Sequence, residues 1–200
     1  MTPKDKDLNT LNFAGQSLDG ADFQDTHGER VLFDDSSLVK ARFSRARFDR
    51  VKFRRANLER AVLDHGAFID CKFEEAILEN AQLDHSDFRV ADFFEAKASH
   101  AVFDHSNLRD ANFWATELIG ASFVDVDARK TQWSKAILDG ATFENADLRR
   151  ADFSHARLSD TVFENCALAG AKFTNLEGAD LRGQSKEGIV VEKAESPPSP

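Results

Sequence analysis

A five-residue periodicity runs through most of the chain and limits its fold more than any other feature. Every fifth residue from Leu8 to Phe173 gives 34 positions, of which 17 are Phe and 13 are Leu. The exceptions are Gly28, Ala98, Ala128 and Trp133. The position two residues earlier, read from 11 to 171, is Ala in 18 of 33 cases and is otherwise mostly small. Neither series contains a charged residue, so we expect both positions to face a continuous apolar core.

Neither a helix nor a straight strand suits this pattern. A step of five residues turns an α-helix by a net angle of about 140°, so the apolar residues would spiral around it. In a strand, an odd step moves the side chain to the opposite face. We therefore expect short extended pieces in which the small and the large residue point inward. Three polar residues follow each pair and include a bend, so that equal bends wind the chain around a dry core.

The repeats also resemble those of a known family. Residues 41–45 read Ala-Arg-Phe-Ser-Arg, residues 56–60 read Ala-Asn-Leu-Glu-Arg, and residues 151–155 read Ala-Asp-Phe-Ser-His. Over about residues 8–183 the chain resembles the pentapeptide-repeat family. The resemblance implies an all-β fold, a right-handed quadrilateral β-helix in which four repeats make each coil and the chain makes about eight to nine coils.

A second periodicity of twenty residues supports this fold. The series from 18 to 158 in steps of 20 is Leu except for Ala98, and most of the series from 13 to 173 is Phe. Identical side chains that stack at the spacing of adjacent strands form ladders. We expect the structural core to include Phe33, Phe53, Phe73, Phe93, Phe113, Phe153, Leu58 and Leu78.

The domain organisation follows from where the repeat begins and fails. We expect an N-terminal extension at 1–7, the solenoid with its C-terminal cap at 8–183, and a partly disordered tail at 184–200. Gly178 stands where Leu or Phe belongs, which indicates a cap over the open end. Residues 188–191, Gly-Ile-Val-Val, either pack over that end or pair with another subunit, so the C-terminal end is a candidate homodimer contact.

Several functional classes are not favoured by this sequence. We expect no signal peptide and no membrane span, because no apolar run approaches about 18 residues, and we expect a cytoplasmic protein. Cys71 and Cys166 fall on the small inward series and are predicted to be structural. The chain contains no phosphate-binding loop, nucleophile elbow or zinc-protease motif, so we expect no enzymatic activity and no cofactor.

Two sets of basic side chains follow the period of the repeat and are candidate sites. His65, His85 and His105 are twenty residues apart, and each follows an Asp. Because stacked imidazoles point outward in parallel, we expect solvated polar residues there and no metal site. An arginine ring, Arg45, Arg50, Arg55 and Arg60, occupies the same position in four successive repeats. A ring suits nucleic acid poorly, since a duplex needs a basic stripe along one face, so we expect no direct nucleic-acid binding.

An acidic block with two outward aromatic residues is the best candidate site. Residues 64–127 contain 14 acidic and 4 basic side chains. Phe94 and Trp114 are twenty residues apart and each follows an inward Phe. Exposed aromatic residues often mark a partner site. We expect a protein-binding surface made by Phe94, Trp114, Asp84, Asp87 and Asp104; the alternatives are a solubilising surface and aromatic residues that cover the poorly filled level near Ala98.

Apart from a purely structural rod, two functional hypotheses remain open. The Qnr-like and MfpA-like branch of the family mimics DNA, binds DNA gyrase or topoisomerase IV, and protects these enzymes from quinolone poisons. The uninterrupted rod and the net charge of −9 match this branch. The basic ring, the lack of inserted loops and the lack of a long apolar C-terminal segment depart from it. The alternative is a general protein-interaction scaffold or effector-type module with an unknown target.

Overall fold

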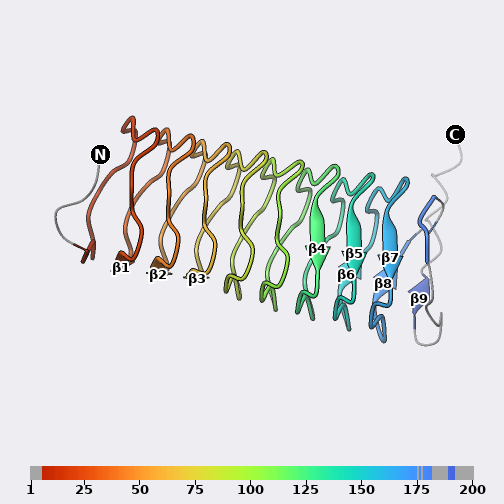
Figure 1. The fold of residues 1–200 in the computed structure, drawn as a ribbon. Helices are drawn as coiled ribbons and strands as arrows, with labels where there is room; N and C mark the ends of the chain where they lie inside the picture. Colours follow the sequence, from red (N-terminus) through yellow and green to blue (C-terminus); the bar gives the residue numbers. More distant parts are fainter. Residues whose placement is uncertain (1–5, 175, 177, 182–188, 192–200) are drawn as a thin grey trace, which may run out of the picture.

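The computed structural model describes residues 6–174, 176, 178–181 and 189–191. These residues form a long four-sided β-solenoid of about eight turns, with the first repeats at one end and the last at the other (Figure 1). The described residues contain no helix, and hence none that is long and apolar enough to cross a membrane. The predicted all-β quadrilateral solenoid is confirmed.

Three small parallel sheets stand out among many single bridges. Each sheet has three strands, and every strand pairs with the corresponding strand one coil away. The first sheet contains β1 (His27–Glu29), β2 (Arg47–Asp49) and β3 (Ala67–Ile69); the second contains β4 (Ser122–Val124), β5 (Thr142–Glu144) and β7 (Val162–Glu164); the third contains β6 (Asp152–Phe153), β8 (Lys172–Phe173) and β9 (Val190–Val191). Isolated parallel bridges connect the coils elsewhere.

The register of these pairs defines four faces. Phe48 pairs with Phe68 and Ser122 with Thr142, so partners are twenty residues apart. We number the faces by their inward residues: the first face carries 8, 28 and on to 168, the second 13 to 173, the third 18 to 158 and the fourth 23 to 163. Residues five apart lie on adjacent faces, and residues ten apart lie on opposite faces.

Each corner is a tight turn with one residue in the left-handed conformation. Thr10, for example, has φ of 58°, and similar values recur at every fifth residue through most of the solenoid. The amide of Leu11 donates to the carbonyl of Leu8 and closes the turn at 3.0 Å. L-residues adopt this conformation reluctantly. Here the same residue also donates its amide to the next coil, as Thr10 does to the carbonyl of Glu29 at 3.0 Å, which stabilises the corner.

Stacked side chains fill the interior. On the second face, the rings of Phe53 and Phe73 lie 4.9 Å apart with planes 3° from parallel. Rings of opposite faces meet edge to face, as Phe93 and Phe103 do at 88°. Each of the eight predicted core residues is at most 1% exposed: Phe33, Phe53, Phe73, Phe93, Phe113, Phe153, Leu58 and Leu78.

Two exceptions to the repeat have a steric explanation. At Gly28 a β-carbon would lie 2.7 Å from Cγ2 of Val31, so a valine at the small position fills the space of the missing large side chain. Trp133 continues the second-face stack 4.2 Å from Phe113. Its indole Nε1 donates a hydrogen bond of 2.5 Å to Oγ1 of Thr131, which satisfies the buried polar atom.

The ends of the solenoid differ from its middle. Asp7 already bridges to His27, so the coil begins within the predicted extension; residues 1–5 lie outside the described residues. At the other end Val162 bridges to Asp180, and Lys172 pairs with Val190, which shortens the spacing from twenty residues to eighteen. β9 thus adds to the chain's own solenoid. The rest of the predicted tail at 184–200 lies outside the described residues, and a homodimer contact there stays a prediction.

Candidate functional site

The aromatic corner, which we define as Phe94 and Trp114, lies at the turn between the second and third faces. The two rings stack 5.1 Å apart with planes 5° from parallel, and both are partly buried. Nζ of Lys135, one coil further along, lies 4.7 Å from the centroid of the Trp114 ring. Because Phe94 and Lys135 come from opposite neighbouring coils, they occupy the two faces of the indole.

A polar column braces this pair from the adjoining second face. Oδ1 of Asp92 accepts hydrogen bonds from the amide of Phe94 at 3.1 Å and from Nδ2 of Asn112 at 2.8 Å. Oδ1 of Asn112 accepts one from the amide of Trp114 at 3.1 Å. The backbone of both aromatic residues is therefore held in place before any partner arrives.

Glu74 precedes Phe94 by one coil in the same column. Its Oε2 is buried without a hydrogen-bond partner. Burial raises the pKa of the Glu74 carboxyl, and the negative charge of Asp92 adds to the effect, against the opposing influence of Lys72 and Arg54. A hydrogen bond with its own backbone also lowers the pKa, but the burial of this carboxylate is still costly, because desolvation penalises its charged form.

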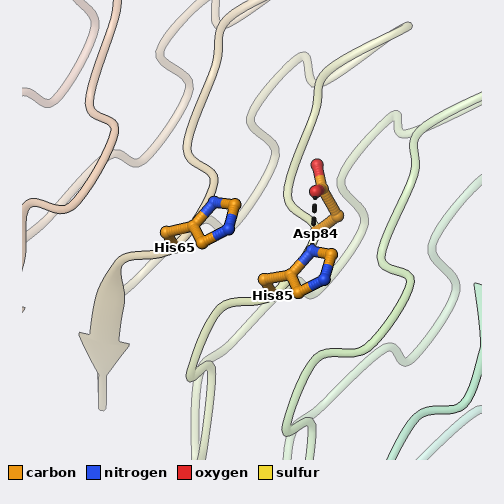
Figure 2. A group of neighbouring side chains, drawn as sticks. All are labelled: His65, Asp84 and His85. Carbon is orange, nitrogen blue, oxygen red and sulfur yellow. Dashed lines mark hydrogen bonds and ion pairs between the residues drawn. The ribbon is translucent and has the colours of Figure 1, made fainter.

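The histidine corner lies at the turn between the fourth and first faces; we define it as His65, His85 and His105 with the aspartates that precede them. His65 and His85 stack 4.7 Å apart with planes 2° from parallel, and His85 and His105 lie 4.6 Å apart at 36°. Nδ1 of His65 lies 3.1 Å from Oδ2 of Asp64, and Nδ1 of His85 lies 2.9 Å from Oδ2 of Asp84 (Figure 2).

The structure separates the five predicted docking residues. Asp84 and Asp104 precede Phe94 and Trp114 by ten residues, half a coil, so they occupy the diagonally opposite corner. Asp84 contacts His85, and Oδ1 of Asp104 accepts hydrogen bonds from Oγ of Ser122 at 2.7 Å and from the amide of Val124 at 2.9 Å.

Asp87 lies elsewhere again. It is on the first face and pairs with Arg89 through contacts of 2.7 to 3.0 Å. Phe94 and Trp114 are thus brought together at one corner, and Asp84 and Asp104 lie together at the opposite one. The acidic side chains beside the aromatic corner are Glu74, Glu75, Asp92 and Glu95.

The predicted arginine ring carries many internal ion pairs. Arg45 reaches back one coil to Asp25 and Arg55 to Asp35, each with an Nε–Oδ1 distance of 2.7 Å. The hydrogen bond from Arg45 lowers the pKa of Asp25 to about 2. Arg50 contacts Asp49 at 2.9 Å. Because acidic partners neutralise the ring, its field is weaker than the count of arginines suggests.

A second basic feature escaped the sequence analysis. A hollow of about 340 Å³ is lined by Arg109, Arg129, Lys130, Arg149, Arg150 and Ala169. Arg109, Arg129 and Arg149 belong to a column in steps of twenty that also includes Arg89, and this column could have been found by reading the charged positions at that period. Hydrogen bonds from Arg129 and Arg149 lower the pKa values of Asp127 and Asp147 respectively.

The cysteines carry no sign of reactivity. Cys71 is fully buried, and burial raises the pKa of its thiol. A thiol is nucleophilic only as the thiolate, so Cys71 is inert. Cys166 is partly buried, and its Sγ lies 3.3 Å from the carbonyl of Phe143.

Known proteins place the chain in one family. The family model described as "Pentapeptide repeats (8 copies)" matches residues 29–64, 52–89 and 68–103. A second family model, "Pentapeptide repeat region", matches residues 97–173. A comparison with curated proteins gave no match.

Two solved structures share the fold. HetL, a pentapeptide repeat protein involved in heterocyst differentiation regulation in the cyanobacterium Nostoc sp. strain PCC 7120, is 23% identical with a TM-score of 0.57; the match covers 92% of this chain and 89% of HetL. QnrB1, a plasmid-mediated fluoroquinolone resistance protein, is 22% identical with a TM-score of 0.54, and the match covers 93% of each chain. The repeats, the four-sided coil and these matches agree that the chain belongs to the pentapeptide repeat family.

Proposed function

We propose that this protein is a non-enzymatic, protein-binding rod that docks through its aromatic corner. The observation that carries the proposal is the braced stack of Phe94 and Trp114, two aromatic rings on the outside of the rod. An aromatic side chain that is ordered before binding loses little conformational entropy when the partner arrives. The kind of partner, a protein, agrees with the resemblance to QnrB1.

The charges around the corner define the chemistry of the partner. Glu74, Glu75, Asp92 and Glu95 lie beside the rings on the Phe94 side, Lys135 lies over the Trp114 ring, and the whole chain has a net charge of −9. A complementary surface is basic, with an apolar or planar group that meets the edge of the indole. Such charges mainly accelerate association, whereas the aromatic pair slows dissociation.

The first partner to test is a type II topoisomerase, DNA gyrase or topoisomerase IV, in the cytoplasm. The acidity of the rod and its likeness to QnrB1, a fluoroquinolone resistance protein, support this choice. In this role the rod replaces DNA on a basic surface of the enzyme and itself binds no nucleic acid. A general scaffold with another target is the alternative, and the likeness to HetL, which is involved in differentiation regulation, supports it equally.

The decisive experiment compares Trp114→Ala with Val90→Ala. Val90 is 51% exposed and sits at a different corner, so its truncation removes apolar surface without touching the aromatic pair. Binding to gyrase and topoisomerase IV is measured at 0.1 M and 0.5 M salt, together with supercoiling in the presence of a fluoroquinolone. We expect wild type and Val90→Ala to bind, and Trp114→Ala to lose about 2 kcal/mol of binding free energy. Higher salt should weaken all three, because it screens long-range attraction.

Two outcomes would change the proposal. If wild type binds neither enzyme, the topoisomerase assignment is wrong. The scaffold target is then sought in host lysate, as a protein that wild type and Val90→Ala retain and Trp114→Ala does not. If Trp114→Ala and wild type retain the same partners with the same affinity, the aromatic corner is not the docking site.

A further inference from the structure

The three imidazoles of the histidine corner form a column on the outside of the rod. His65, His85 and His105 are 55%, 48% and 46% exposed at their side chains. They share the fifth position of the repeat, with φ values of 55°, 56° and 60°, so their backbones present them in the same direction. The parallel rings of His65 and His85 in Figure 2 follow from this identical placement.

The aspartates set which nitrogen of each ring is free. An ionised carboxylate only accepts hydrogen bonds, so the Nδ1 atoms that face Asp64 and Asp84, at 3.1 and 2.9 Å, carry the hydrogen. In the neutral imidazole the lone pair is then on Nε2. Two adjacent rings therefore present unprotonated Nε2 atoms side by side. A carboxylate behind a histidine ligand is the usual outer shell of a metal site, where it fixes the ring and raises its basicity.

We propose that His65 and His85 bind a divalent transition-metal ion through Nε2, with Asp84 as the orienting carboxylate. One ligand atom from each of His65, Asp84 and His85 lies within 4.8 Å of the others. Metal–imidazole bonds of about 2.0–2.1 Å require the two nitrogens to approach more closely than the ring spacing of 4.7 Å. The rings are half exposed, so they can tilt toward one another, and the neighbouring pair, His85 and His105, is already tilted by 36°.

The donor set selects the class of ion. Imidazole suits Zn²⁺, Ni²⁺ and Cu²⁺, whereas Mg²⁺ and Ca²⁺ require oxygen ligands. Two imidazoles leave the remaining coordination positions to water. The site lies diagonally opposite the aromatic corner, so it is independent of the proposed docking function.

The test is isothermal titration of the full chain with Ni²⁺, Zn²⁺ and Mg²⁺. His85→Asn removes the central ligand, and asparagine tolerates the left-handed backbone of that position. His100→Asn is the matched control: its φ is 58°, and its neighbours one coil away are Asn80 and Gly120, so it has no imidazole beside it. Thermal melts in a chelator verify that both variants fold like wild type.

We expect wild type and His100→Asn to bind Ni²⁺ and Zn²⁺ with equal affinity and to ignore Mg²⁺. His85→Asn should weaken binding at least tenfold. Asp84→Asn, which retains both imidazoles, should weaken it by about 10- to 100-fold, as expected for the loss of an orienting carboxylate. Electron paramagnetic resonance of bound Cu²⁺ should show two nitrogen ligands in wild type and one in the double variant His65→Asn/His105→Asn, in which His85 is the one imidazole left in the column. Equal affinities of His85→Asn and wild type, or no binding by wild type at millimolar metal, would overturn the proposal.

Discussion

The inner ladders and the corner columns of this rod have the same stacking geometry but different surroundings. Phe93 and Phe113 stack inside at 4.7 Å and 5°, and Phe94 and Trp114 stack at the corner at 5.1 Å and 5°. Both follow from the same twenty-residue coil. The inner rings are 0% exposed, whereas the corner rings are partly exposed.

The difference shows where the stability of the rod resides. Phe93 also meets Phe88 of the adjacent first face at 5.7 Å and Phe103 of the opposite fourth face at 5.8 Å, both edge-on. A corner ring has neighbours mainly along its own column. Repetition inside therefore gives a closely packed core, and repetition outside gives rows of similar groups that are available to other molecules.

The largest contrast is expected from the same substitution at two adjacent residues. Phe93→Asp places an unpaired charge in the dry core, and burial of such a charge costs several kcal/mol, comparable to the stability of a whole domain. We expect this variant to unfold or aggregate. Phe94→Asp should fold, with a β-type circular dichroism spectrum like that of wild type. A soluble and equally stable Phe93→Asp would show that the inward face is assigned wrongly.

Truncation should sharpen the comparison. Phe113→Ala leaves a cavity between Phe93 and Trp133 and should lower the free energy of unfolding by about 4 kcal/mol. Trp114→Ala removes one partly exposed stack and one cation–π contact, and should cost about 1 kcal/mol. Chemical denaturation measures both. Equal losses would mean that the corner column is a structural element of the core.

Replacement of Glu74 is expected to raise the free energy of unfolding, whereas the substitutions above lower it. Because burial raises its pKa, the charged form destabilises the fold at neutral pH, and this cost disappears as pH falls through the raised pKa toward the ordinary value. Glu74→Gln should therefore raise the free energy of unfolding by about 1 kcal/mol at pH 7. Its advantage over wild type should vanish near pH 3. A variant that is less stable at pH 7 would indicate that Glu74 has a partner in solution.

The smallest effect concerns the ion pairs of the arginine column. The hydrogen bond from Arg129 lowers the pKa of Asp127. The pair therefore adds to the free energy of unfolding at pH values above the ordinary pKa of Asp, and this contribution is lost as the pH falls through the lowered pKa. Asp127→Asn should destabilise the protein by about 0.5 kcal/mol at pH 7. Denaturation at pH 2 should show no difference from wild type. A difference that persists there would assign the effect to the hydrogen bond rather than to charge.

Much of the fold could be predicted from the sequence because the period of five marks the inward residues directly. The number of sides came from resemblance, since a period alone does not set how many bends close a coil. Gly28 could not be explained without the structure, because its compensation by Val31 depends on a contact between the two series. The eighteen-residue spacing of the cap also depends on packing at an end where the repeat is lost.

The candidate site was predicted only in part. The period of twenty predicted the stacking of Phe94 on Trp114 and the histidine column. It did not reveal that Asp84 and Asp104 lie diagonally opposite the aromatic pair, because charges summed over blocks of sequence ignore which corner each residue occupies. Lys135 was missed for a related reason: its contact with Trp114 is a step of twenty-one residues rather than twenty.

Up to Phe173 each coil has twenty residues, so the remainder of a residue's number on division by twenty gives its position around the rod. Removal of twenty residues would shorten the rod and leave all columns aligned. Removal of one pentapeptide would keep every core position filled, yet would rotate everything beyond it by a quarter turn. Between His85 and Phe94, for example, such a loss would bring the two diagonal corners onto neighbouring edges. The length of the rod and the relative orientation of its surfaces can thus be changed separately. Changes of twenty residues alter the length alone, whereas changes of five residues also rotate one part of the surface relative to the other.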